Sequence, residues 1–289
     1  MINIKPKWKT SIEDVFTIIN SKNISDRQLL NSISGELTYR MMQYVIYRKN
    51  LHWLHRSSYS KQESDALELC YDSNTDALSS LKKSIIENIS SQNDYLLQKC
   101  PYCLVRNPDT WDHYMPKSKY PEFSVFSGNL LRVCGTCNIK KSNGLVEGKK
   151  ETIHTYFDIL PNEELLKCEI KVSRSGVPII NFFIQNPKKL DIVNSVINHF
   201  NAFELNDLYK SESSSFISVR LQELANNYTN GISKETFIDE IRNRYNAIPL
   251  HWGYNNWEAA VLKGMSNCVE LVDIINGLPK NTGNDWERK

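Results

Sequence analysis

The stretch CPYCLVRNPDTWDHYMPKSKYPEFSVFSGNLLRVCGTCNIKK, residues 100–141, decides how this chain of 289 residues folds. It begins with one Cys-x-x-Cys pair and ends shortly after a second one. Four thiolates in two short pairs are typical of a tetrahedral zinc site, because each pair can bind one edge of the same ion. The sequence therefore predicts a structural Zn²⁺ held by four cysteines, Cys100, Cys103, Cys134 and Cys137.

The segment between the two pairs is longer than in a usual zinc ribbon, which has about 15–20 residues there. It contains the only Asp-His dipeptide of the chain, Asp112-His113. Two redox-active Cys-x-x-Cys motifs are the alternative, but each would open a helix in a βαβ setting. Neither pair has that setting, so the pattern favours a metal site that holds a small functional module.

The residues between the pairs predict two strands and a helix. Trp111–Met115 is prone to form a strand, and Pro116 ends it because proline has no N–H to donate to a neighbouring strand. A loop follows over Lys117–Gly128, and Asn129–Val133 is the returning strand. A short helix begins at Asn138. The sequence therefore predicts a zinc-stabilised ββα arrangement.

This order of residues resembles the HNH, or ββα-metal, nucleases that carry a structural four-cysteine zinc. The resemblance rests on Asp112-His113 in the first strand, Asn129 at the second, and Asn138 directly after the second cysteine pair. It implies a metal-dependent endonuclease that hydrolyses phosphodiester bonds of nucleic acid. In such an enzyme His113 is the general base, Asn129 orients it, and Asp112 with Asn138 binds one catalytic divalent ion.

Residue chemistry agrees with these implied roles. An unperturbed histidine has a pKa of about 6.5, so His113 can accept a proton from water near neutral pH. The last motif position, usually histidine in the family, is Asn138. Hard oxygen ligands from Asp112 and Asn138 favour Mg²⁺ or Mn²⁺ over Zn²⁺ or Ni²⁺. Neighbours in a strand face opposite sides, so Asp112 shares a site with His113 only where the backbone bends.

Positive charge gathers around this module. The chain has a net charge of +2, whereas residues 99–150 contain nine Lys or Arg and four Asp or Glu. A local basic excess suits a surface that binds phosphates, although it also suits a merely solvated face. Candidate phosphate contacts are Lys117, Lys140 and Lys141, with Lys119 and Arg132 as further candidates.

The flanks of the module predict an α+β chain with three regions: a helical region over 1–96, the ββα-metal module over 97–150, and a mixed, mostly helical accessory region over 151–289. Apolar residues recur at helical spacing in the first region, with helices expected over Ile12–Ser21, from Ser25 or Asp26 to Tyr47, and over Gln62–Ile89 with a break near Asp72–Asn74. The third region predicts strands over Thr152–Leu160, Leu166–Val172 and Val177–Phe183, followed by helices that include Trp257–Gly277.

Composition indicates a cytoplasmic protein without a membrane partner. The most apolar stretch, Val177–Ile184, is too short to span a bilayer, and no signal-peptide core is visible near Met1. Three of the seven cysteines lie outside the two pairs and are scattered, which argues against a secreted disulfide framework.

Other functions stay open beside the nuclease. One is a zinc-stabilised nucleic-acid-binding or interaction subunit without catalysis. The run from Asp112 to Ser124 also resembles, more loosely, HNH subunits of Septu-type bacterial anti-phage systems, which act beside an ATPase. That resemblance implies a protein partner and weak cleavage by the isolated chain. DNA is favoured over RNA as the substrate, and cutting both strands would require a homodimer or two events.

Overall fold

The structure, a computed structural model, describes residues 2–8, 10–141, 149–186, 188–248 and 253–280. The chain divides into two compact units, Met1–Leu160 and Pro161–Lys289. In its described residues, each unit contains helices and one small antiparallel sheet, which confirms the expected α+β class. None of the described helices is both long and apolar enough to cross a lipid bilayer. The three functional regions expected from the sequence remain a prediction.

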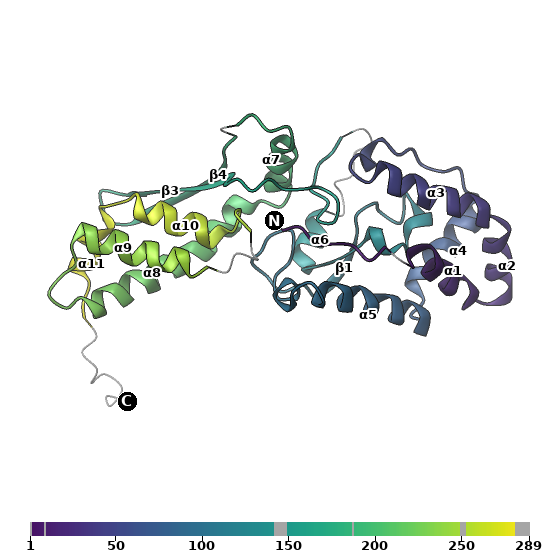
Figure 1. Ribbon diagram of the computed structural model, residues 1–289, viewed down its shortest axis with the longest axis horizontal. Helices are drawn as coiled ribbons and strands as arrows, with labels where there is room; N and C mark the ends of the chain where they lie inside the picture. Colours follow the sequence, from purple (N-terminus) through teal and green to yellow (C-terminus); the bar gives the residue numbers. More distant parts are fainter. Residues whose placement is uncertain (1, 9, 142–148, 187, 249–252, 281–289) are drawn as a thin grey trace, which may run out of the picture. The chain divides into compact units, whose positions relative to one another are not determined.

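Helices form most of the first unit ahead of the cysteine-rich segment (Figure 1). They are α1 (Ser11–Asn20), α2 (Ile24–Ser32), α3 (Ser34–Tyr47), α4 (Lys61–Asp72) and α5 (Asp76–Ser90). The expected break near Asp72–Asn74 is confirmed. Side chains begin two of these helices: Ser60 and Glu63 form a reciprocal capping box at α4, and Thr75 accepts a hydrogen bond from the backbone N–H of Leu78 at α5.

The expected single helix from Ser25 or Asp26 to Tyr47 is instead two helices, α2 and α3. Asn23 begins α2, because its side chain accepts a hydrogen bond from the backbone N–H of Asp26 at 2.9 Å. Ile33, with φ −105° and ψ 16°, separates the two helices. Serine and glycine around this point are weak helix formers, and the apolar periodicity alone does not reveal the break.

The expected ββα arrangement is present in the first unit. Strand β1 (Thr110–His113) pairs antiparallel with β2 (Leu130–Val133), and α6 (Gly135–Lys141) follows directly. The pairing aligns Asp112 with Leu131 and His113 with Leu130. The first strand ends before Met115, and Asn129 closes a 3₁₀ turn before the second strand rather than opening it. Both differences place the site residues at the ends of strands, where the backbone changes direction.

The sequence predicts a strand over Thr152–Leu160, and this prediction is wrong. The segment is a buried turn in which the backbone N–H of Asp158 donates to the carbonyl of His154 at 2.9 Å. The Asp158 carboxylate accepts in return from the backbone N–H of His154 at 2.8 Å. Its apolar residues Ile153, Tyr156 and Phe157 are buried, whereas Ile159 is exposed, and this mixture explains a pattern that resembles a strand.

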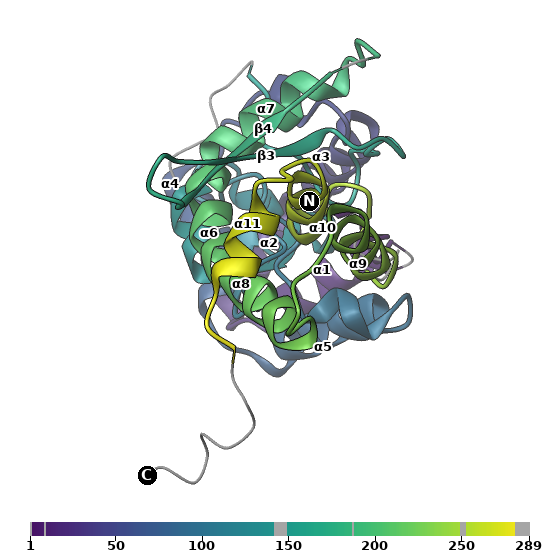
Figure 2. The ribbon, with the colours of Figure 1, turned by 90° about the vertical axis from the view of Figure 1, so that its left-hand side faces the viewer.

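In the second unit a hairpin lies along a set of helices. Strand β3 (Leu166–Val172) pairs with β4 (Pro178–Ile184), and the described helices are α7 (Ile192–Ala202), α8 (Leu205–Asn227), α9 (Lys234–Asn246), α10 (Trp257–Ser266) and α11 (Leu271–Gly277). β3 packs against α10 and β4 against α8 (Figure 1). Figure 2 shows α7 beside β4 from a second direction. The expected helix Trp257–Gly277 is two helices, because α10 ends at Ser266 and α11 begins at Leu271.

Candidate active site

The four cysteines of the two pairs lie together. Their sulfur atoms are all within 4.8 Å of one another, and all four residues are buried. A zinc ion with Zn–S bonds of about 2.3 Å needs sulfurs about 3.8 Å apart, which this cluster can provide with little movement. The residues therefore fit a metal ion such as Zn²⁺. The second pair, Cys134 and Cys137, spans the junction of β2 and α6, so a bound ion would fix the start of the helix.

His113 ends β1 with one ring nitrogen fixed and the other available. Its Nε2 lies 2.8 Å from the carbonyl oxygen of Ser124. Because a carbonyl only accepts, Nε2 carries the proton and Nδ1 has the lone pair. Nδ1 has no hydrogen-bond partner among the described residues. The ring also makes a T-shaped contact with the ring of Tyr71, with centroids 4.4 Å apart.

Burial affects the protonation of His113. Loss of hydration lowers the pKa of the imidazole to about 4, and the hydrogen bond to Ser124 opposes this only in part. The side chain is nevertheless half-buried rather than fully enclosed. At neutral pH the residue is therefore uncharged, as a proton acceptor must be.

Asn129 fixes the loop between the two strands. It is fully buried, and its Oδ1 accepts from the backbone N–H of Met115 at 2.7 Å. Its Nδ2 donates to the carbonyls of Met115 at 3.0 Å and Phe123 at 3.1 Å. One amide therefore closes both ends of the loop that carries Ser124, the partner of His113. This geometry suits the orienting role expected for Asn129.

A second layer of polar groups holds Asn129 from behind. The hydroxyl of Tyr44, on α3, lies 3.1 Å from Asn129 Oδ1 and 3.1 Å from Nε2 of His154. His154 Nδ1 accepts from the backbone N–H of Tyr156 at 3.3 Å, so Nε2 carries the proton and donates to Tyr44. Burial holds the pKa of His154 well below its usual value. His154 thus lies beside the site, and Tyr44 reads in the sequence only as a core residue of a helix.

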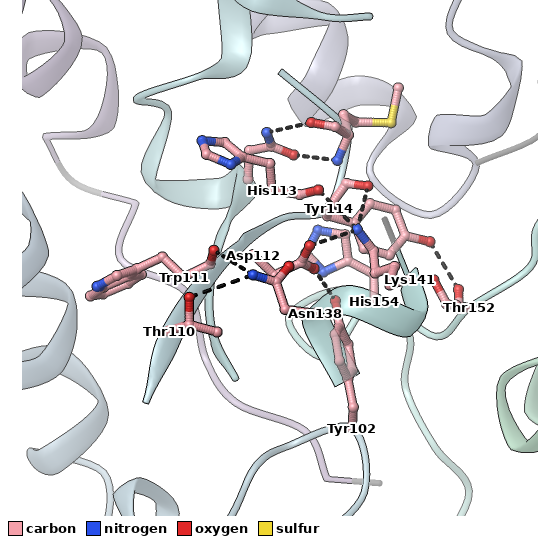
Figure 3. A network of polar contacts seen from close by, with 12 residues as sticks. Tyr102, Thr110, Trp111, Asp112, His113, Tyr114, Asn138, Lys141, Thr152 and His154 are labelled. Carbon is pink, nitrogen blue, oxygen red and sulfur yellow. Dashed lines mark hydrogen bonds and ion pairs between the residues drawn. The ribbon is translucent and has the colours of Figure 1, made fainter. Parts of the chain in front are cut away.

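Asp112 faces the interior on the other side of β1 (Figure 3). One carboxylate oxygen accepts from the Tyr102 hydroxyl at 2.7 Å, and the other from the Lys141 ammonium at 3.0 Å. Lys141 also donates to the carbonyls of His113 at 2.8 Å and Tyr114 at 3.0 Å. These bonds use the three N–H groups of the ammonium, so in this arrangement Lys141 has none left for a phosphate.

The remaining candidates lie nearer the surface. Asn138, on α6, donates to the Trp111 carbonyl at 3.2 Å, and its Oδ1 accepts no hydrogen bond from the described residues (Figure 3). Lys117 is paired with the Asp72 carboxylate at 2.6 Å, and Lys140 is half-buried at the end of α6. The structure therefore brings the predicted residues together on one hairpin and one helix, with different partners for each.

The expected pair of ligands for a catalytic divalent ion fits only in part. The amide oxygen of Asn138 is a free, hard oxygen donor, as Mg²⁺ or Mn²⁺ requires. The Asp112 carboxylate already binds an ammonium ion, whose positive charge would repel a dication on the same carboxylate. Of the two expected ligands, only Asn138 has a side-chain oxygen without a hydrogen bond from the described residues.

A comparison with known proteins finds a similarity to a phage protein. Over 129 residues the chain is 28% identical to Protein ea31 of Escherichia phage lambda. The aligned segment covers 42% of this chain and 43% of the phage protein. The match thus spans less than half of the relative's length. No protein-family model matches the chain, and no solved structure does.

Proposed function

We propose that this chain is an HNH-type endonuclease that hydrolyses phosphodiester bonds of nucleic acid, with DNA as the favoured substrate and His113 as the general base. One observation carries the proposal: Nε2 of His113 is fixed by the Ser124 carbonyl, while Nδ1 has a lone pair and no partner among the described residues. The hydrogen bonds of the Asn129 amide to Met115 and Phe123, here called the clamp, keep the Ser124 loop in place. A protein that only binds nucleic acid has no need of such a base.

In the proposed reaction, Nδ1 of His113 accepts a proton from a water molecule as the water oxygen attacks phosphorus. The new P–O bond forms while the bond to the leaving sugar oxygen breaks, and the imidazole holds the proton as a cation. The Ser124 carbonyl stabilises that cation through the Nε2–H hydrogen bond. Asn129 acts on His113 through the loop and contributes orientation rather than proton transfer.

A divalent ion, Mg²⁺ or Mn²⁺, completes the proposal with Asn138 as its protein ligand. Magnesium sites commonly use one or two protein ligands together with substrate phosphates and several waters, so a single amide oxygen is compatible with such a site. When bound, the ion would neutralise the charge that develops on the phosphate. Lys117 and Lys140 would add positive charge along the strand that is cut.

Cleavage of supercoiled plasmid by the purified chain tests the proposal. We expect nicking that requires Mg²⁺ or Mn²⁺, stops with EDTA, and is lost in His113→Ala. His52→Ala is a matched control, because His52 is another half-buried histidine of the first unit and lies outside the clamp made by Asn129. Equal nicking by the wild type and His113→Ala would refute His113 as the base.

A binding or interaction subunit without catalysis is the second candidate, and one surface favours a protein partner. On α3, the side chains of Tyr39, Met42 and Ile46 follow helical spacing and are 61%, 53% and 71% exposed. A partner such as the ATPase of a Septu-type defence system would cover such a stripe. Plasmid binding without nicking by the isolated chain, followed by nicking once a co-purified partner is added, would show that the partner is required.

A further inference from the structure

Lys141 differs from a surface lysine because its side chain is buried and its ammonium is fully hydrogen-bonded. It is the last residue of α6, and its side chain is 4% exposed. Its ammonium meets three acceptors at 2.8–3.0 Å: the Asp112 carboxylate and the carbonyls of His113 and Tyr114. Three N–H groups and three acceptors make a saturated cation site.

We propose that Lys141 is the fixed cation of this site, which positions His113, and that Asp112 is its counter-ion rather than a ligand of a divalent ion. The effect of Lys141 on catalysis rests on the proposed nuclease function. The assignment of Asp112 as its counter-ion does not.

The partners of Asp112 support the second half of this proposal. Its carboxylate is 5% exposed, and both oxygens accept hydrogen bonds from buried donors, Tyr102 and Lys141. A buried carboxylate with a bound ammonium is already neutralised. A dication that replaced Lys141 would leave the ammonium buried without its counter-ion. A dication that shared the carboxylate with Lys141 would be repelled by the ammonium.

The two backbone acceptors support the first half. The carbonyls of His113 and Tyr114 belong to the point where β1 ends and the clamped loop begins. A hydrogen bond from Tyr114 N–H to the Asn129 carbonyl at 2.9 Å holds the same point from the β2 side. Lys141 therefore ties the end of α6 to the two peptide groups that flank Tyr114, and its loss would alter where the imidazole points.

Four variants of the zinc-loaded chain of 289 residues test the proposal: Asp112→Asn, Lys141→Met, the double variant and, for comparison, Asn138→Ala. Mn²⁺ binding is measured by the EPR signal of free Mn²⁺, and stability by urea denaturation. We expect Asp112→Asn to change Mn²⁺ affinity by less than twofold, whereas Asn138→Ala weakens it at least fivefold. Lys141→Met frees the carboxylate, so it either binds Mn²⁺ at least tenfold more tightly or fails to fold.

The double variant keeps the test decisive where Lys141→Met fails to fold. With both charges removed, it should fold even where Lys141→Met does not, and it should not gain Mn²⁺ affinity. Where both single variants fold, it should lose less stability than their two losses added together. A tenfold loss of Mn²⁺ affinity in folded Asp112→Asn would overturn the proposal, because Asp112 would then be a ligand. Strictly additive losses of stability would overturn it as well.

Cleavage supplies a separate measurement of positioning. In the folded double variant we expect kcat for plasmid nicking to fall at least tenfold while KM stays within twofold, since Lys141 acts through His113 and not on the DNA. Unchanged kcat would refute the positioning role. If the wild type nicks neither alone nor with a co-purified partner, the proposed nuclease function fails. The Mn²⁺ and stability measurements still decide whether Lys141 and Asp112 form a buried ion pair that takes no divalent ion.

Discussion

Asn129→Ala should destabilise the first unit far more than Asn138→Ala, although both residues belong to the same predicted motif. Removal of the Asn129 amide leaves the N–H and the carbonyl of Met115 buried, with no other hydrogen-bond partner among the described residues. The Phe123 carbonyl keeps a hydrogen bond from Phe126 N–H at 3.2 Å. The Tyr44 hydroxyl keeps its hydrogen bond to the Gly128 carbonyl. The loss therefore concerns two groups rather than four.

The magnitude follows from these two groups. A buried polar group that loses its partner costs about 1–3 kcal/mol, so the expected loss is about 2–6 kcal/mol. Asn138 is partly exposed, and water can replace its bond to the Trp111 carbonyl. Its removal should cost about 1 kcal/mol or less. Because domains of ordinary stability unfold with about 5–15 kcal/mol, the difference is easily measured.

Urea denaturation with hydrogen-exchange mass spectrometry on peptides from 100–141 reports the first unit without interference from the second. We expect a lower midpoint for Asn129→Ala, together with faster exchange at Met115. The matched Asn138→Ala should show neither effect. A loss below about 1 kcal/mol for Asn129→Ala, or equal losses for the two variants, would refute the clamp as the function of this amide.

Three further predictions concern zinc, pH and packing. The purified chain should contain one zinc ion, measured by mass spectrometry of the metal, and Cys137→Ser should lose it and lower the melting temperature. His154 has a folded-state pKa held below that of the unfolded chain, so below about pH 6.5 only the unfolded state gains a proton, and stability should fall by up to about 1.4 kcal/mol per pH unit. His154→Gln should flatten that dependence in urea titrations at pH 5–7, and an unchanged slope would contradict the assignment. Gly264→Ala should destabilise the second unit by about 1–3 kcal/mol relative to Gly277→Ala, because its new Cβ would lie 2.8 Å from the Cys168 carbonyl while Gly277 has open space. Equal melting curves would show that β3 can move away from α10.

Local patterns predicted the parts of the fold that depend on short sequence distances. The cysteine spacing predicted the four-cysteine cluster, and Pro116 with the apolar runs on either side of the loop predicted the hairpin. Apolar periodicity failed at Ile33 and over Thr152–Leu160, where a helix break and a buried turn depend on hydrogen bonds rather than hydrophobicity.

Site residues show the same limit. The motif predicts one site around His113, but Asp112 faces the interior on the other side of β1. A lysine in a basic segment likewise reads as a phosphate contact. Only the folded chain reveals that Lys141 turns inward. Two of its acceptors are carbonyls at the bend after β1, and the third is the Asp112 carboxylate, which Tyr102 holds by a hydrogen bond. Tyr44 and His154 lie so far from Asn129 in sequence that no local pattern connects them. The catalytic roles themselves stay predictions until cleavage is measured.

The hydrogen bonds of Tyr44 also determine when this site can be completed during synthesis. The cysteine pairs and the hairpin are close in sequence, so they can form as soon as residues 100–141 have left the ribosome. The Asn129 amide, however, depends on Tyr44, 85 residues earlier, and Tyr44 is held by His154, 110 residues after it. The loop therefore reaches its final rigidity only after His154 has emerged. A nascent chain that stops short of this residue should bind zinc but keep the His113 loop loosely ordered, which delays a mature site until most of the first unit exists.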